Sequence, residues 1–182
     1  ATGKPLWVFD AKGHEPAEKR TEDHLVATPV YAGDTVLVAA GGDPEGGGGP
    51  GCLWAVDART GKERWRLAGE AFGRSISTVA VHDKRVYAVE LAGYLHCVDL
   101  ETGVEIWKSD LQADAWGSPL VADGKVYVRN GDGDVIVFEA GWKQKRLARN
   151  TLPRLGHGTP VAANGTLYLA GEDRLYAVGG VR

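Results

Sequence analysis

The sequence has few of the features that mark several large classes of protein. It contains no methionine and only two cysteines, Cys52 and Cys97, which form no Cys-x-x-Cys pair. A zinc site and a disulfide framework are therefore both disfavoured, and we expect each cysteine to be a small buried hydrophobe. No apolar run approaches the roughly 20 residues that span a bilayer. Because neither a methionine nor a signal-peptide pattern is present, we expect a mature, trimmed or excised chain.

A basic surplus is also missing. The formal net charge is −3, with 25% charged and 43% hydrophobic residues. Grooves that bind nucleic acid normally carry an excess of Lys and Arg, so this composition argues against a nucleic-acid partner. A chain of 182 residues with this apolar content is instead long enough to bury a sizeable core.

Helical periodicity of apolar residues is also absent, and the sequence shows an internal repeat instead. Each repeat starts with a Thr or Ser eight residues before an apolar pair, at Thr28, Thr78, Ser118 and Thr159. The intervals between these positions are 50, 40 and 41 residues. A glycine-rich insertion at 41–51 explains the longest interval. The polar segment 11–24 is the one stretch that is helical or loose, and we expect a long loop there.

Each repeat alternates β-branched and aromatic runs with turn residues. The stretches "AGD", "HDK", "ADG" and "ANG" fit tight hairpins, and "DARTG" and "DLETG" fit a later hairpin in the same unit. Four short strands in each unit of about 40 to 50 residues are typical of propeller blades. The sequence therefore predicts one all-β propeller domain over 1–182. We expect its four-stranded antiparallel blades at 25–68, 75–110, 115–148, and 156–178 plus 4–10.

The two ends of the chain bear on how such a ring closes. The last repeat stops after "LYAVGGVR" without a tryptophan strand, whereas "KPLWVFD" at 4–10 is a tryptophan strand without a preceding unit. We expect residues 4–10 to pair with the C-terminal blade, because a paired edge resists aggregation. Three arrangements remain open: a closed four-bladed ring, two chains that complete an eight-bladed ring, or half of a longer propeller. We favour two chains completing a larger ring.

The turn before each tryptophan resembles a known repeat. The pattern A/C-x-D-x-x-T-G-x-x-x-W occurs at 55–65 and again at 97–107. It resembles the repeat of the pyrroloquinoline-quinone-type (PQQ-like) propellers, over nearly the whole chain. That family includes quinoprotein alcohol dehydrogenases, outer-membrane assembly lipoproteins and many bacterial secreted proteins. The resemblance is specific for the repeat and leaves the activity open, and it implies a bacterial chain with a periplasmic or secreted location.

The resemblance assigns a structural role to three tryptophans. It implies that Trp7, Trp65 and Trp107 dock between neighbouring blades, and a large ring at regular intervals suits a wedge between sheets. The third unit, "EAGWKQKRL", lacks the Thr-Gly pair. There Leu147 falls where a tryptophan is expected, and Trp142 is displaced into the hairpin. We therefore expect the third blade to be looser than the others.

Propeller ligands usually bind at one mouth of the central channel, where the loops between blades gather. Candidate residues lie two or four positions before each repeated Thr or Ser: His24, Arg74, Asp114, Trp116 and His157. Arg74 with Trp116 and His157 offers a cation and aromatic rings, which suit a flat anion. The alternative, which we favour, is channel packing with a salt bridge from Asp114, because a fold does not by itself give a function.

A quinoprotein site makes further demands. The family's dehydrogenases hold calcium with Glu and Asn beside the quinone, use an Asp as base, and often carry an adjacent pair of cysteines. No adjacent cysteine pair exists here. Asn130, Asp132 and Asp134 in "NGDGD" offer oxygens that suit calcium. These residues are also ordinary hairpin formers, so we expect no metal site and consider PQQ with calcium only for a dehydrogenase.

The other residues of reactive types have no partner in the sequence pattern that would make a catalytic site. The glycine-rich loop is not followed by Gly-Lys-Ser/Thr, so it is no phosphate loop; we expect an excursion over the mouth. His96 takes the position of Trp54, which favours packing or an exposed face. The remaining candidates, which belong to no nucleophile–base arrangement, are His14, His82, Ser75, Ser77 and Ser118.

The sequence leaves three functional hypotheses. The first is a non-catalytic binding or scaffold propeller that presents loops to a protein or small ligand, with a second copy of itself as a further partner. The second is the C-terminal half of a PQQ-dependent quinoprotein dehydrogenase with an incomplete cofactor site. The third is a sensor domain of a larger signalling protein.

Overall fold

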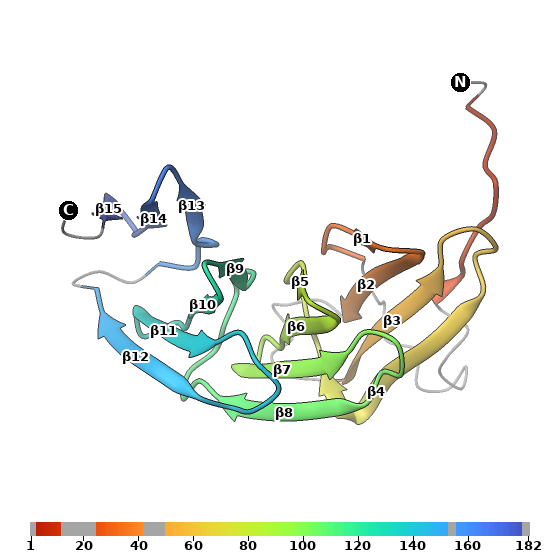
Figure 1. Ribbon diagram of the computed structural model, residues 1–182, viewed down its shortest axis with the longest axis horizontal. Coiled ribbons are helices and arrows are strands. Elements are labelled where there is room, and N and C mark those ends of the chain that lie inside the picture. The colour runs from red at the N-terminus through yellow and green to blue at the C-terminus, as the bar shows by residue number, and fades with distance from the viewer. Residues whose placement is uncertain (1–2, 12–24, 42–49, 153–155, 180–182) are drawn as a thin grey trace.

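The computed structural model describes residues 3–11, 25–41, 50–152 and 156–179. These residues form four antiparallel β-sheets that succeed one another in an open arc (Figure 1). We call the sheets blades 1 to 4. Within each blade the strands follow sequence order, with the first strand on the concave side of the arc and the last on the convex side. The predicted all-β propeller class is confirmed.

The first three blades have four strands and the fourth has three. Blade 1 contains β1 (Val30–Ala32), β2 (Thr35–Gly41), β3 (Pro50–Asp57) and β4 (Glu63–Gly73). Blade 2 contains β5 (Ala80–His82), β6 (Arg85–Val89), β7 (Tyr94–Asp99) and β8 (Glu105–Asp110). Blade 3 contains β9 (Leu120–Ala122), β10 (Lys125–Arg129), β11 (Asp134–Glu139) and β12 (Arg146–Thr151). Blade 4 contains β13 (Val161–Ala163), β14 (Thr166–Ala170) and β15 (Leu175–Gly179).

The turn between the third and fourth strands shows why the Asp-x-x-Thr-Gly pattern recurs. In blade 2 the Oδ1 atom of Asp99 accepts bonds from the Glu101 amide (3.1 Å), the Thr102 amide (2.8 Å) and the Thr102 hydroxyl (2.8 Å). Gly103 then adopts a φ of +72°, a conformation that glycine tolerates best. Asp57, Thr60 and Gly61 repeat this arrangement in blade 1. The pattern is therefore a turn signature.

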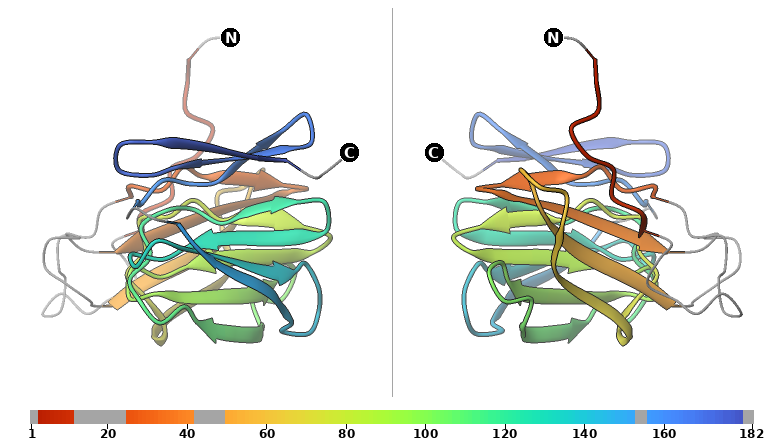
Figure 2. Two further views of the ribbon diagram at one scale, coloured as in Figure 1. Left: turned by 90° about the vertical axis from the view of Figure 1, so that its left-hand side faces the viewer. Right: turned by 90° about the vertical axis from the view of Figure 1, so that its right-hand side faces the viewer.

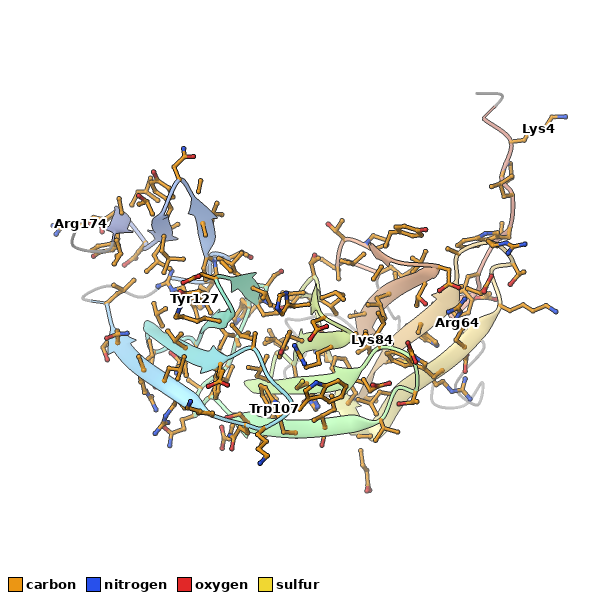
Figure 3. All side chains as sticks on the ribbon, viewed as in Figure 1. Lys4, Arg64, Lys84, Trp107, Tyr127 and Arg174 are labelled. Carbon is orange, nitrogen blue, oxygen red and sulfur yellow. The ribbon has the colours of Figure 1, made fainter. Side chains whose placement is uncertain are left out.

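The same glycines receive the tryptophans of the preceding unit. A Cβ on Gly103 would lie 2.6 Å from the Trp65 ring, and one on Gly61 would lie 2.7 Å from the Trp7 ring. Each indole also donates to a backbone carbonyl of the next blade: Trp65 to Leu100 at 2.9 Å, and Trp107 to Gly141 at 3.0 Å. Trp65 and Trp107 thus each contact the blade that follows their own, and Figure 3 labels Trp107 on β8. Trp7 contacts blade 1 and has no described blade before it.

The cores of the molecule lie between blades. One cluster joins blades 1 and 2 and is built from Leu37, Leu53, Trp65, Phe72, Val86 and Val98 among others. A second joins blades 2 and 3 and includes Tyr87, Leu95, Trp107, Val126, Ile136 and Phe138. Both cysteines are buried and neither forms a disulfide in the described residues; Cys52 lies in a third cluster under the N-terminal segment and Cys97 in the second. Their prediction as small buried hydrophobes is confirmed.

The repeated Thr and Ser positions join the blades along the inner rim. The amide of Thr28 donates to the Thr78 hydroxyl (3.0 Å), that of Thr78 to Ser118 (2.9 Å), and that of Ser118 to Thr159 (2.9 Å). Each hydroxyl therefore binds the backbone of the blade before it. This series explains why a small hydroxyl residue heads every repeat.

The N-terminal segment corrects one prediction. Residues 4–10 lie beside blade 1 (Figure 2) and at the opposite end of the arc from β15 (Figure 1), and the Trp7 indole donates to the Ala58 carbonyl at 3.1 Å. Within the described residues of this chain, blade 4 gains no strand from residues 4–10. The physical reason is the direction of docking: each tryptophan packs on the blade that follows it, so Trp7 packs on blade 1. Pairing of residues 4–10 with a second copy of the chain stays a prediction.

The third blade corrects a second prediction, that Leu147 occupies the tryptophan position. The registers pair Ala55 with Trp65 and Cys97 with Trp107, and in blade 3 they pair Val137 with Ala148. Ala148, rather than Leu147, therefore occupies the tryptophan position. The hairpin closes with a bond from the Glu139 amide to the Lys145 carbonyl, one residue farther than the bond from Asp99 to Val104 in blade 2. Leu147 is exposed as a result.

Candidate binding surface at the channel mouth

Three of the predicted site residues meet at one end of the channel. Asp114, Trp116 and His157 lie on the connections that lead into blades 3 and 4. The Trp116 indole donates to Asp114 Oδ2 at 2.5 Å, and its ring lies 5.6 Å from the imidazole of His157, tilted by 57°. Trp116 is 37% exposed and His157 is also exposed. The structure thus forms an aromatic pair that faces solvent.

The aromatic pair stands on a rigid base. The Ser77 hydroxyl lies within hydrogen-bonding distance of the carbonyls of Trp116 (3.3 Å) and Gly117 (3.2 Å). Asp114 accepts the Gly131 amide with its backbone carbonyl at 2.7 Å, and a Cβ on Gly131 would lie 2.0 Å from the Asp114 carboxylate. Blades 2 and 3 therefore both hold the connection that carries Trp116. Fixed side chains on such connections are well suited to bind a partner.

The remaining predicted site residues do not join this surface. Arg74 is 7% exposed and lies against the backbone of Gly41 in blade 1. Its carbonyl accepts the Leu91 amide at 2.8 Å, which ties the connection to the second blade. His24 lies outside the described residues, as do the glycine-rich stretch 42–49 and most of the segment 11–24. Binding of a flat anion by these residues stays a prediction.

The structure contains a buried charge network that the sequence did not predict. The imidazole of His96 is fully buried in blade 2, 2.6 Å from Glu90 through Nε2 and 2.6 Å from Glu105 through Nδ1. Lys108 lies 3.4 Å from Glu90 and 4.2 Å above the Tyr94 ring. No sequence motif connects these residues, because a β-turn and a strand pairing bring them together. Of the two alternatives predicted for His96, packing or an exposed face, its burial and its contact with Phe72 of blade 1 support packing.

Glu90 is the member of this network whose ionised form the surroundings favour. Burial opposes ionisation of Glu90, but the bonds from His96 and the Gly73 amide outweigh it and hold the pKa of Glu90 below its usual value. The Gly73 amide belongs to blade 1, so the Glu90 carboxylate is bonded across the junction between the two blades. This network stabilises the fold, and its deep burial separates it from the channel mouth.

The described residues do not assemble a nucleophile with a base. The Ser75 hydroxyl donates to the Val89 carbonyl at 2.7 Å, while the hydroxyls of Ser77 and Ser118 hold the connections between blades. Burial raises the pKa of the Cys97 thiol to about 12, which disfavours the reactive thiolate. Each of these side chains thus has a structural role.

Two of the three residues considered for calcium, Asn130 and Asp134, are engaged by other groups of the protein. Asn130 donates to the Leu111 carbonyl at 2.8 Å and accepts the Asp134 amide at 2.9 Å. Asp134 is bound by Thr151 and Arg149, which hold its pKa below its usual value despite burial. Among the described ranges, no group of three or more His, Cys, Asp or Glu side chains is arranged to hold a metal ion. The side-chain oxygens of Asn130 and Asp134 are therefore already used within blade 3.

Known proteins share the repeat and the fold. A sequence model of the family described as "Outer membrane protein assembly factor BamB" matches residues 49–141. The chain is 34% identical over 125 residues to a protein of that name from Burkholderia pseudomallei, across 68% of this chain and 30% of that protein. It is also 34% identical over 138 residues to quinohemoprotein alcohol dehydrogenase ADH-IIG from Pseudomonas putida, across 61% of this chain and 19% of the enzyme.

A solved structure agrees with the fold. The crystal structure of BamB from Moraxella catarrhalis superposes with a TM-score of 0.63 at 22% identity, across 80% of this chain and 43% of that one. The chain thus spans less than half the length of these relatives. Within the described residues, no helix is long and apolar enough to cross a bilayer.

Proposed function

Because the chain belongs to the PQQ-like propeller family whose sequence model is described as outer membrane protein assembly factor BamB, we propose that it is a non-catalytic propeller scaffold that binds another protein. Its partner is a protein of the outer-membrane assembly process, and its location is the periplasm. The relatives support this proposal through their names and their shared repeat. The fold alone is shared with enzymes, so the argument for binding depends on the site.

The observation that carries the proposal is the solvent-facing pair of Trp116 and His157. Tryptophan is enriched among the residues that contribute most to protein interfaces, because it buries a large rigid surface at little entropic cost. Asp114 and Ser77 hold this tryptophan in place before any partner arrives. A partner would thus bind a surface that is already ordered, and preorganisation favours affinity.

The test compares two exposed tryptophans. Trp116 lies at the channel mouth, whereas Trp142 lies in the hairpin between β11 and β12 and is 52% exposed. The purified chain and its Trp116→Ala and Trp142→Ala variants are immobilised and exposed to periplasmic extract of the source bacterium. Quantitative mass spectrometry should find a protein of outer-membrane assembly that wild type and Trp142→Ala capture and Trp116→Ala loses. Equal capture by all three would contradict a binding role for the mouth.

The dehydrogenase alternative predicts a different result. The Asn130 and Asp134 oxygens are engaged within blade 3, so they offer poor ligands for calcium beside a quinone. A cofactor that binds only the folded chain must raise its melting temperature. We expect PQQ with Ca²⁺ in large excess to leave the melting temperature unchanged. A saturable rise would favour the enzyme.

A second copy of the chain is a further partner to test. Residues 4–10 expose Leu6 (92%) and Val8 (83%), and blade 4 has three strands. Two chains whose N-terminal segments add to each other's fourth blades would form an eight-bladed ring, since head-to-tail contacts close when the rotation permits. Light scattering should then give twice the monomer mass, and removal of residues 1–10 should restore the monomer.

A further inference from the structure

The junction between blades 3 and 4 contains a cleft. Its volume is about 780 Å³, within the range of pockets that hold small molecules. The wall is largely apolar and comes from both blades: Tyr127, Val135 and Val137 from blade 3, and Leu167, Leu169 and Val178 from blade 4. Figure 3 shows Tyr127 on the side of blade 3 that faces blade 4. At the other two junctions, buried clusters of apolar side chains join the blades.

One end of this junction holds a buried cation. Arg129 ends β10 at the position where blade 1 has Ala39 and blade 2 has Val89, and it is 1% exposed. Its neighbour across the sheet is Val135, which lines the cleft. Its Nη1 atom donates to the Ala170 carbonyl, whereas Nε and Nη2 have no hydrogen-bond partner. A buried guanidinium with unused donors is costly, so it needs a reason.

The unused donors have a recognisable geometry. Nε and Nη2 form one edge of the guanidinium, and that edge binds a carboxylate through two parallel hydrogen bonds. Gly156 backs the group, because a Cβ there would lie 2.8 Å from Nη1 and 2.9 Å from Nη2. The buried Tyr176 hydroxyl is also without a partner, and its neighbour across the sheet is Leu169, another residue of the cleft wall. Arg129 and Tyr176 do not themselves line the cleft, but each pairs across its sheet with a residue that does, so one cation and one hydroxyl lie next to an apolar cavity.

We propose that this cleft binds a monocarboxylate with an extended apolar body, such as a medium-chain fatty acid. The carboxylate takes the Nε–Nη2 edge of Arg129 and accepts the Tyr176 hydroxyl, while the hydrocarbon chain lies along the valines and leucines of both blades. One negative charge matches the one unpaired cation, and a dianionic phosphate would leave a second charge unbalanced in a buried place. The site is separate from the channel mouth and does not depend on the proposed protein partner.

Three probes separate the contribution of the carboxylate to binding from that of the hydrocarbon chain. Calorimetric titration of the whole chain with decanoate should give saturable one-to-one binding. Decan-1-ol keeps the hydrocarbon and lacks the charge, whereas acetate keeps the carboxylate and lacks the hydrocarbon. Each should bind about tenfold more weakly or worse, since a hydrogen-bonded charge and a buried chain each contribute at least that factor. No binding of decanoate, or equal binding of decanoate and decan-1-ol, would overturn the proposal.

Substitutions locate the site. Arg129→Met keeps the volume and removes the charge, so it should lower decanoate affinity about tenfold or more and leave decan-1-ol binding unchanged. Its melting temperature without ligand should equal or exceed that of wild type, because a half-paired buried charge is removed. Arg129→Lys, which keeps the charge but loses the two-pronged edge, should bind decanoate more weakly than wild type. Wild-type affinity in both variants would exclude the site.

A measurement on the unaltered protein guards against variants that misfold. A fatty acid with a photoreactive diazirine on its chain should label peptides from β10–β11 and β14–β15 after irradiation. Excess decanoate should suppress this labelling. Labelling that falls on other blades, or that decanoate does not reduce, would overturn the assignment. Capture of a protein partner at Trp116 should be unchanged in Arg129→Met, which keeps this test distinct from that of the proposed function.

Discussion

The junctions that flank blade 2 and the junction between blades 3 and 4 solve the same packing problem differently. Trp65 and Trp107 each insert between two sheets and donate an indole hydrogen bond to the next blade. At the third junction Ala148 stands at the corresponding register position, and a cleft remains. The difference teaches that the side chain at this one register position affects how closely the apolar centres of neighbouring sheets pack.

The largest expected effect comes from removal of a wedge. Trp107 is 8% exposed and packs between blades 2 and 3, so Trp107→Ala should lower the free energy of unfolding by about 3–5 kcal/mol. Leu147→Ala, at an exposed position of β12, should change it by less than about 0.5 kcal/mol. Urea denaturation followed by tryptophan fluorescence measures both. Similar losses in the two variants would mean that the junctions do not differ as described.

A second prediction tests the surface that receives the wedge. Gly103→Ala combines a positive φ with a collision against Trp65, and should cost about 3 kcal/mol. Gly165 has the same backbone conformation with open space around it, so Gly165→Ala should cost only about 1 kcal/mol. Thermal and chemical denaturation should rank them in this order. The reverse order would show that the tryptophan contact is unimportant.

The third prediction concerns charge at the junction of blades 1 and 2. The folded-state pKa of Glu90 lies below its usual value, so its carboxylate stabilises the fold above the unfolded-state pKa. This contribution is lost as the pH falls through the folded-state value. Glu90→Gln should therefore cost about 2 kcal/mol at pH 7, and the difference from wild type should shrink in acid. Glu101→Gln, an exposed partner of Lys84, serves as control and should have little effect at either pH.

The smallest expected effect is a gain. Ala148→Trp places an indole at the register position that Trp65 and Trp107 occupy, and should stabilise the chain by about 1 kcal/mol. Leu147→Trp points its ring toward solvent and should give no gain. Melting temperatures of the two variants decide the matter. A gain from Leu147→Trp alone would show that the register of β12 has been misassigned.

Local patterns predicted the repeating features of the molecule. The Asp-x-x-Thr-Gly turn depends on residues close together in sequence, and the Thr and Ser positions recur in every repeat, so a single chain sufficed to identify both. The docking role of the tryptophans was implied by the family resemblance. Leu147 was assigned wrongly because counting from the turn assumes equal hairpins, and the third hairpin is one residue longer. His96 meets Glu90 across a β-turn and Glu105 across a strand pairing of blade 2, and no sequence motif links the three residues. Arg129 could have been noticed in the sequence, because it is a charged residue at a position where the other blades have small apolar ones.

The hydroxyl series along the inner rim has a consequence for how such chains are built. The hydroxyls of Thr78, Ser118 and Thr159 each accept a hydrogen bond from the backbone amide of the Thr or Ser in the preceding repeat. This bond involves no other residue of either repeat. Duplication, loss or exchange of a whole unit would therefore leave every seam chemically identical. Evolution can lengthen, shorten or shuffle such an array without redesigning the joints, while sequence drift accumulates on the outer strands.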